Sequence, residues 1–233
     1  MTPFNNTHII SVGGAVPCAQ TFVQRGIQIS QCFAYDVKGD WWFNVPALKL
    51  PRSNCALCVC FESLLYAFGG IAYEYGRIGD IERWKVVETE GCFGGAWEQV
   101  WVRAFCGMEV LVRSHACALQ VSESKILVFG GSERKKVFDS VFEFDLEDCS
   151  IRQKNNMKTN GAFFYSSFSV KGNAVWAVDN ESILHKYTIQ DDSWDCFNLR
   201  ELETDFNYMK IGKCLRSGDE QQISNDAPME IEV

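Results

Sequence analysis

Three features of this sequence could support chemistry. The densest group of thiols is Cys55-x-x-Cys58-x-Cys60, and closely spaced thiolates can bind zinc. Pairs of glycines end three apolar runs, and glycine-rich loops can cradle phosphate. Histidines can act as bases or bind metals, and the chain has three of them: His8, His115 and His185. The same residue types also fill structural roles, so each feature needs a second signal before it predicts a site.

The second signal is missing in each case. No further cysteine pair follows at a distance suited to zinc, and strand alternation would point Cys58 and Cys60 to one side and Cys55 to the other. The glycine pairs lack the Lys-Ser/Thr and the helix-opening pattern of a phosphate loop. The histidines are scattered and form no nucleophile-base order. The sequence therefore predicts no cofactor, no metal and no catalytic residue.

Composition narrows the class of protein. The chain has 233 residues, of which 47% are hydrophobic and 22% charged, and this excludes wholesale disorder. A formal charge of −8 argues against nucleic-acid or anionic-membrane partners. No apolar run approaches the ~18 residues of a membrane span. Residues 1–8 lack Lys, Arg and an apolar block, and the 11 cysteines are an odd number, so we expect a reduced, cytoplasmic protein.

An internal repeat is the strongest pattern in the chain. An apolar run ends in a glycine pair at Gly13-Gly14, Gly69-Gly70 and Gly130-Gly131. A fourth run, 174–178, ends in Asp179-Asn180 instead. Asp and Asn are the non-glycine residues that best tolerate positive φ, so we expect the fourth copy to keep the same backbone conformation.

Further features recur at fixed distances from these runs. Each run is followed by an aromatic-polar-aliphatic strand, at Tyr35-Asp-Val37, Trp84-Lys-Val86, Phe144-Asp-Leu146 and Tyr187-Thr-Ile189. A large residue opens another strand seven residues after the aromatic one, at Trp42, Ile151 and Trp194; Trp97 comes thirteen residues after Trp84, with residues 88–96 absorbing the surplus. Arg52-Ser53 and Arg113-Ser114 each lie 17 residues before their first glycine. Each unit thus predicts four short antiparallel strands, a to d.

This combination of Arg-Ser, apolar run, glycine pair, aromatic strand and delayed Trp resembles the Kelch repeat, whose period is ~50 residues. The resemblance covers roughly residues 8–200, although the third copy has Ile151 for Trp and the fourth lacks both Gly-Gly and Arg-Ser. It implies an all-β fold, a β-propeller of about four blades of four antiparallel strands. We expect blades at 7–50, 51–112, 113–158 and 159–200.

Closure of the ring is open at this point. The first copy has only 12 residues before Gly13, too few for its own Arg-Ser and strand a. Residues 206–211, in a closing segment 201–215, have the alternation of a strand and could pair into blade one. The alternative is an incomplete array that needs a partner chain, so the oligomeric state is not predicted. Residues 216–233 hold five acidic residues against one arginine and are predicted to be a disordered acidic tail.

Antiparallel blades bring the d–a and b–c connections to one face, which the Kelch resemblance also implies to bind ligands. Nine candidate binding residues lie in these connections: Arg52, Ser53, Arg113, Ser114 and His115 in d–a, and Tyr73, Tyr75, Arg77 and Arg134 in b–c. Arg and Tyr are suited to anchoring a partner, and Arg favours acidic ligands. The alternative is that the d–a arginines only brace the blades. We predict a non-enzymatic module binding a protein or peptide; the other possibility is a galactose-oxidase-like enzyme or a carbohydrate or small-molecule binder.

Overall fold

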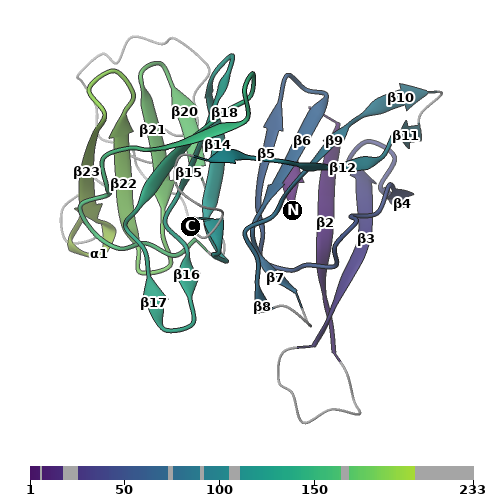
Figure 1. Cartoon of the computed structure of the whole chain (residues 1–233), viewed down its shortest axis with the longest axis horizontal. Helices are drawn as coiled ribbons and strands as arrows, with labels where there is room; N and C mark the ends of the chain where they lie inside the picture. Colours follow the sequence, from purple (N-terminus) through teal and green to yellow (C-terminus); the bar gives the residue numbers. More distant parts are fainter. Residues whose placement is uncertain are drawn as a thin grey trace, which may run out of the picture. The chain divides into compact units, whose positions relative to one another are not determined.

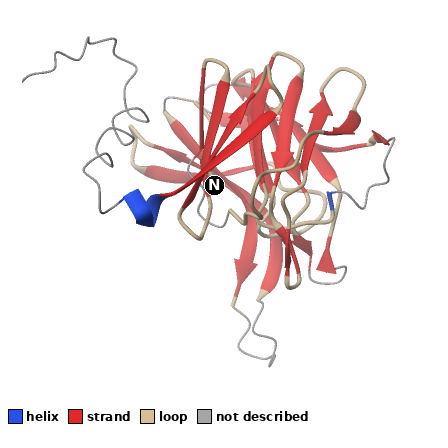
Figure 2. Cartoon of the chain, turned by 90° about the vertical axis from the view of Figure 1, so that its left-hand side faces the viewer, coloured by secondary structure: helices blue, strands red, loops and turns tan. Residues whose placement is uncertain are grey.

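The computed structural model describes residues 1–5, 7–17, 26–72, 76–89, 92–104, 111–163 and 168–202. Figure 2 shows that strands dominate these ranges, as the sequence predicted; a short helix, α1 (Leu199–Leu202), follows the last strand. The chain divides into two compact units, 1–197 and 198–233, and the sheets belong to the first apart from the last residue of β23, Asn198. Among the described residues, no helix is long and apolar enough to cross a bilayer.

Within these ranges, four mainly antiparallel sheets follow one another along the chain (Figure 1). Sheet 1 consists of β1 (Thr2–Pro3), β2 (His8–Val16), β3 (Ile27–Asp36) and β4 (Trp41–Val45). Sheet 2 consists of β5 (Ala56–Cys60), β6 (Leu64–Phe68), β9 (Ile81–Lys85) and β12 (Trp97–Val100). Sheet 3 consists of β14 (Cys117–Ser122), β15 (Lys125–Phe129), β18 (Val141–Asp145), β19 (Ser150–Gln153) and a parallel edge strand, β13 (Arg103–Ala104). Sheet 4 consists of β20 (Phe168–Lys171), β21 (Ala174–Val178), β22 (Ile183–Thr188) and β23 (Ser193–Asn198).

Two-stranded ribbons extend three of the connections. They are β7–β8 (Ile71–Ala72 with Gly76–Arg77), β10–β11 (Val87–Thr89 with Cys92–Gly94) and β16–β17 (Ser132–Glu133 with Lys136–Val137). The β10–β11 ribbon takes up the surplus residues of the second repeat. Trp84 therefore still pairs with Trp97, as Tyr35 pairs with Trp42 and Phe144 with Ile151.

The first repeat does have its own strand a. Thr2 pairs with Ile10 and Pro3 with Ile9, so two residues of the N-terminal segment form the inner strand of sheet 1. The prediction that this strand must come from elsewhere or be missing is wrong, because a two-residue edge strand needs far less than a 17-residue lead, and an edge tolerates proline. Residues 206–211 and 216–233, predicted as closing strand and acidic tail, lie outside the described residues.

In the described part of the chain, the core consists of three apolar clusters, each between two consecutive sheets. We call face A the side of a sheet that carries the Tyr/Trp/Phe row of β3, β9, β18 and β22, and face B the opposite side. Face A of sheet 2 packs on face B of sheet 1, and the same arrangement recurs between sheets 2 and 3 and between sheets 3 and 4. Among the described residues, no such cluster joins sheet 4 to sheet 1.

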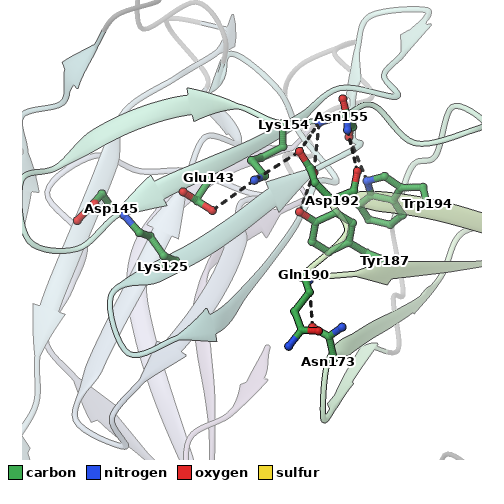
Figure 3. Close-up of polar contacts among 10 residues, drawn as sticks. All are labelled: Lys125, Glu143, Asp145, Lys154, Asn155, Asn173, Tyr187, Gln190, Asp192 and Trp194. Carbon is green, nitrogen blue, oxygen red and sulfur yellow. Dashed lines mark hydrogen bonds and ion pairs between the residues drawn. The ribbon is translucent and has the colours of Figure 1, made fainter.

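A polar network supplements the apolar packing between sheets 3 and 4 (Figure 3). The indole N–H of Trp194 donates to the carbonyl of Asn155 at 3.1 Å, and the Asn155 side chain donates to the Asp192 carbonyl at 2.8 Å. Asp192 also accepts from the Tyr187 hydroxyl at 2.8 Å and pairs with Lys154 at 3.4 Å. The segment that leaves sheet 3 is thereby fixed to sheet 4.

The glycine pairs connect neighbouring sheets, and their backbone conformation there requires glycine. Gly69 and Gly70 have φ of 60° and 108°, and a Cβ on Gly69 would lie 2.6 Å from the Arg113 carbonyl oxygen. The N–H of Gly70 donates to that carbonyl at 2.9 Å, which joins sheet 2 to sheet 3. Equivalent bonds run from Gly14 to Arg52 and from Gly131 to Gly161. Only glycine adopts this conformation at so close an approach without strain.

Candidate interaction surface

Arg52 lies at the start of sheet 2 with its side chain fully buried, at 0% exposure. Its Nη2 donates to Glu82 Oε1 at 2.6 Å, and its Nη1 donates to the carbonyls of Gly69 and Asp80 at 3.1 and 2.9 Å. Glu82, 2% exposed, also accepts two backbone N–H groups of the segment before Arg52, at 2.7 and 3.1 Å. This buried ion pair fixes the connecting segment to strands β6 and β9.

Arg113 occupies the same place in sheet 3 with different partners. Its Nη1 donates to the Gly130 carbonyl at 2.8 Å and its Nη2 to the Ser140 hydroxyl at 3.1 Å. The guanidinium also stacks over the rings of Phe138 and Phe142, at 4.6 and 5.0 Å from their centroids. Burial lowers the pKa of Arg113 to about 10, so the guanidinium keeps its charge at neutral pH.

The 17-residue interval has a simple physical cause. In both repeats the arginine donates to the carbonyl of the glycine 17 residues later, Gly69 or Gly130. Because both guanidiniums are buried, neither could contact a partner without leaving this arrangement. These contacts are those of the bracing role that the sequence had left open, and the assignment of Arg52 and Arg113 as binding residues stays a prediction.

In the fourth repeat, other residues form the buried polar contacts that Arg52 and Arg113 form in the second and third repeats. His185 stands where Glu82 stands in sheet 2, and its Nε2 lies 2.9 Å from Asp179 Oδ2, with both side chains buried. The other Asp179 oxygen accepts the N–H groups of Glu181 and Ile183, each at 2.9 Å. Neither Asp179 nor Asn180 has positive φ, so the expected backbone equivalence with glycine is wrong. The aspartate closes the turn with its side chain instead.

The serines of the Arg-Ser pairs join the d–a segments to the b–c ribbons. Ser53 exchanges two backbone hydrogen bonds with Ile71, at 2.9 and 2.8 Å, and Ser114 exchanges two with Ser132, at 3.0 and 2.7 Å. Both serines are buried, so they contribute position rather than an exposed hydroxyl. Figure 1 shows ribbons β7–β8 and β16–β17 at the same end of the sheets, with β10–β11 at the other end. The expected grouping of d–a and b–c connections is confirmed for sheets 2 and 3.

We call this end the loop face: segments 52–55, 113–116 and 161–163 with ribbons β7–β8 and β16–β17. Backbone bonds connect the three segments in sequence, from His115 N–H to the Asn54 carbonyl at 3.0 Å and from Phe163 N–H to the His115 carbonyl at 2.8 Å. Asn54 and His115 have matching φ of 54° and 57°, so consecutive repeats turn here in the same way.

A cavity of about 1260 Å³ reaches the loop face and runs along the inner strands. Asn54, His115 and Phe163 lie on its wall at the loop face, while β1, β5 and β14 supply the deeper wall. Small-molecule sites occupy ~300–1,000 Å³, so this space is large enough for a peptide side chain or a loop.

Exposed cations lie on ribbon β16–β17, which is the b–c connection of the third repeat. Arg134, Lys135 and Lys136 are consecutive and exposed, and the Lys136 ammonium lies 5.1 Å from the centroid of the Phe138 ring. Arg134 has φ of 54°, which places it at the turn of the ribbon. Of the other predicted b–c residues, Tyr73 and Tyr75 lie outside the described residues, and only the backbone of Arg77 is described, in β8.

The thiols of the second repeat pack rather than react. Cys58 and Cys60 lie in the cluster between sheets 2 and 3, whereas Cys55 contacts the cluster between sheets 1 and 2, as strand alternation predicted. Hydrogen bonding to Cys60 and burial hold the pKa of Cys58 well above its ordinary value, and burial raises that of Cys55. Cys55 and Cys58 therefore stay protonated at neutral pH and are poor nucleophiles. Within the described ranges, no group of three or more His, Cys, Asp and Glu could hold a metal ion.

Seven of the nine predicted residues lie in the segments and ribbons of the loop face: Arg52, Ser53, Arg77, Arg113, Ser114, His115 and Arg134. Among the seven, His115 and Arg134 are the ones described as reaching solvent, whereas Arg52, Ser53, Arg113 and Ser114 are buried. Sequence reasoning missed Glu82 and His185, whose signal was their equivalent place in the repeat, and Asn54, which follows Arg-Ser as His115 does. Whether any of these residues contacts a partner stays a prediction.

Comparison with known proteins supports the repeat. No family model matches the chain. Part of it is similar to a Kelch repeat protein. Over 64 residues it is 38% identical to "Kelch repeat and BTB domain-containing protein 1" of Ectromelia virus (strain Moscow), which is 27% of this chain and 11% of the viral protein. The chain therefore matches only a small part of that relative, and the similarity together with the all-β sheets is consistent with Kelch-type repeats.

Proposed function

We propose that this chain is a non-enzymatic, Kelch-type interaction module that binds a protein or peptide at its loop face. The observation that carries the proposal is the β16–β17 ribbon, which presents three consecutive exposed cations in a chain of net charge −8. Loops held on a rigid β scaffold are a common place for binding residues. The name of the viral relative points the same way, because Kelch repeats in it stand beside a BTB domain.

The proposed ligand is acidic. Arg134 can bind a carboxylate through two parallel hydrogen bonds, and Lys135 and Lys136 add point charges beside it. A peptide bound there could place a side chain in the cavity mouth, where Asn54, His115 and Phe163 offer polar and aromatic contacts. Tyr73, Tyr75 and Arg77, in or between the strands of the second b–c ribbon, remain proposed contacts. We further propose a cytoplasmic location, in keeping with the protonated buried thiols.

A selection experiment tests this function. A displayed library of random twelve-residue peptides would be panned on the immobilised chain, and the affinity of an enriched peptide measured by fluorescence anisotropy. We expect enrichment of Asp and Glu, and at least about 10-fold weaker binding to Arg134→Ala/Lys135→Ala/Lys136→Ala. Affinity should also fall as salt rises, because exposed charges are screened within ~8–10 Å.

The matched control is Lys38→Ala/Lys85→Ala/Lys171→Ala. It removes the same number of exposed positive charges, from the ends of the strands away from the loop face. Equal weakening by both variants would mean that net charge alone attracts the peptide. Enriched peptides without acidic residues, unaffected by the ribbon variant, would contradict the proposed site.

The cavity favours one alternative, a carbohydrate or small-molecule binder, because about 1260 Å³ would also admit such a ligand. A saturating sugar or metabolite mixture that displaces no selected peptide, and that does not raise the melting temperature, would count against it.

A further inference from the structure

The two end sheets of the array carry faces that are buried everywhere else in it. At the junction between sheets 2 and 3, face B of sheet 2 contributes Tyr66, Phe68, Ile81 and Val100, and face A of sheet 3 contributes Ile126, Phe142, Phe144 and Ile151. All eight are at most 6% exposed. At this junction, face B of one sheet is buried by face A of the next sheet.

Face A of sheet 1 has the same chemistry, and none of the described core clusters covers it. Ile9 pairs with Tyr35 and Tyr35 with Trp42, in the register that joins Ile126, Phe144 and Ile151 in sheet 3. Phe33 completes the row at the position of Phe142. Trp42 is 51% exposed, against 2% for its counterpart Ile151.

Face B of sheet 4 is the complementary surface, with no sheet after it among the described residues. Its apolar residues Trp176, Val178, Leu184 and Phe197 stand at the positions of Tyr66, Phe68, Ile81 and Val100 in sheet 2. Phe197 is 42% exposed, whereas Val100 is 6% exposed. Trp176 and Val178 are half-buried, and Leu184 is already buried within its own chain at 2% exposure, so the uncovered part of this face is the side near Phe197. Lys186 and Asp195 stand where sheet 2 carries Arg83 and Glu98, which pair at 3.0 Å. The end of the array thus repeats both the apolar and the charged pattern of an internal junction.

The tryptophans supply an independent sign of the missing neighbour. The indole N–H of Trp97 donates to the carbonyl of Pro46 at 2.9 Å, and that of Trp194 donates to the carbonyl of Asn155 at 3.1 Å. In both cases the acceptor belongs to the segment that leaves the preceding sheet. Trp42 has the equivalent place in sheet 1, and within the described ranges its ring contacts Tyr35 at 5.0 Å but no such carbonyl.

We propose that two copies of this chain associate head to tail, face A of sheet 1 in one copy packing on face B of sheet 4 in the other. The contact continues the junction that already occurs three times within the chain. A heterologous contact of this kind closes into a ring when the rotation permits. Two copies of four sheets then form a ring of eight, in which both end faces of each copy are covered.

The first test is the mass of the full chain by analytical ultracentrifugation over a dilution series. A dimer that dissociates on dilution is expected, and a monomer at every concentration up to about 100 µM would overturn the proposal. The dilution series needs no variant. If the chain is monomeric and Trp42→Phe does not change how strongly a quencher reduces the tryptophan fluorescence, Trp42 is shielded by closure on its own sheet 4.

The second test distinguishes head-to-tail association from contact between two identical faces. Trp42→Glu and Phe197→Glu each destroy one face in every copy, so each variant alone is expected to be monomeric, with at least about 30-fold weaker association. Mixed together, the two variants retain one intact junction and should form a one-to-one dimer. Trp101→Glu is the control, because Trp101 is 75% exposed and lies in neither face.

Two results would overturn the proposal here. A Phe197→Glu variant that still dimerises would show that face A pairs with face A. A folded mixture that stays monomeric would show that the two faces do not recognise each other. Circular dichroism of each variant confirms folding, and the dilution series of the unmodified chain decides the matter if a variant does not fold.

Discussion

Replacing Arg52 by methionine tests whether the 17-residue spacing shared by the second and third repeats reflects a brace. Methionine keeps much of the apolar volume but removes the guanidinium from Glu82, which is 2.6 Å away and 2% exposed. Removing one partner of a buried ion pair costs ~3–5 kcal/mol, because the other charge remains buried without compensation. The carbonyls of Gly69 and Asp80 each lose one donor as well, although the Asp80 carbonyl still accepts from the Gly69 N–H at 3.1 Å. We expect the free energy of unfolding to fall by about 3–5 kcal/mol, a large part of the ~5–15 kcal/mol of a typical domain.

The assay is urea unfolding followed by tryptophan fluorescence, supported by a thermal melt. At ~2–4 °C per kcal/mol for a domain of this size, the melting temperature should fall by about 6–20 °C. Arg83→Met is the matched control, since Arg83 pairs with Glu98 in the same sheet at 3.0 Å but with 37% and 64% of the side chains exposed. Such an exposed pair contributes ~0–1 kcal/mol. The double variant Arg52→Met/Glu82→Gln should recover part of the loss, because it removes the uncompensated charge.

Equal, small losses for Arg52→Met and Arg83→Met would refute the brace. Intact stability combined with loss of the selected peptide would instead support Arg52 as a binding residue.

Two further predictions concern the same framework. Gly69→Ala should destabilise the chain more than Gly172→Ala. Both glycines have φ near 60°, a conformation that costs a residue with a Cβ ~1–2 kcal/mol. Of these two positions, only Gly69 would also bring the Cβ against backbone, at 2.6 and 2.8 Å from two carbonyl oxygens. Similar unfolding midpoints for the two variants would show that the close approach between sheets is not what requires glycine. Stability should also fall as the pH rises above ~8.5, since the pKa values of Cys58 and Cys117 are raised in the folded chain and an unfolded thiol loses its proton near that pH. The folded state then binds more protons than the unfolded state, so its stability is lost with rising pH. The urea midpoint of unfolding at about pH 7.5 and at about pH 10 measures this fall. The variant Cys58→Ala/Cys117→Ala should reduce the dependence of the midpoint on pH. A midpoint that rises with pH would contradict the raised pKa values of these thiols.

The sequence predicted the strands and their register well, because both follow from local patterns. The aromatic residue and the large residue seven positions later face each other across a hairpin, so their spacing alone indicates that Tyr35 pairs with Trp42 and Phe144 with Ile151. The glycine pairs likewise indicate positive φ, because glycine is the residue type that adopts it most readily.

The direction of the d–a arginines could not be predicted in the same way. The 17-residue interval indicates a shared position, but burial depends on partners distant in sequence, Glu82 for Arg52 and Phe142 for Arg113. From the sequence alone, an arginine in a loop could equally bind a ligand or brace the fold. The decisive information is the carboxylate or ring on the neighbouring strand.

Short strands and substituted turns also escaped sequence reasoning. Thr2–Pro3 is too short to show alternation, yet it forms the inner strand of sheet 1. Asp179 fills a glycine position by accepting two N–H groups with its side chain, a solution that residue preference for positive φ does not anticipate. Both cases depend on tertiary context rather than on local propensity.

Hydrogen–deuterium exchange of the chain with and without a selected acidic peptide tests the proposed interaction surface most directly. Binding at the loop face predicts slower exchange in ribbon β16–β17 and in segments 52–55 and 113–116, with β10–β11 unchanged. Protection confined to β10–β11 and the opposite ends of the strands, or no protection at saturating peptide, would contradict the account.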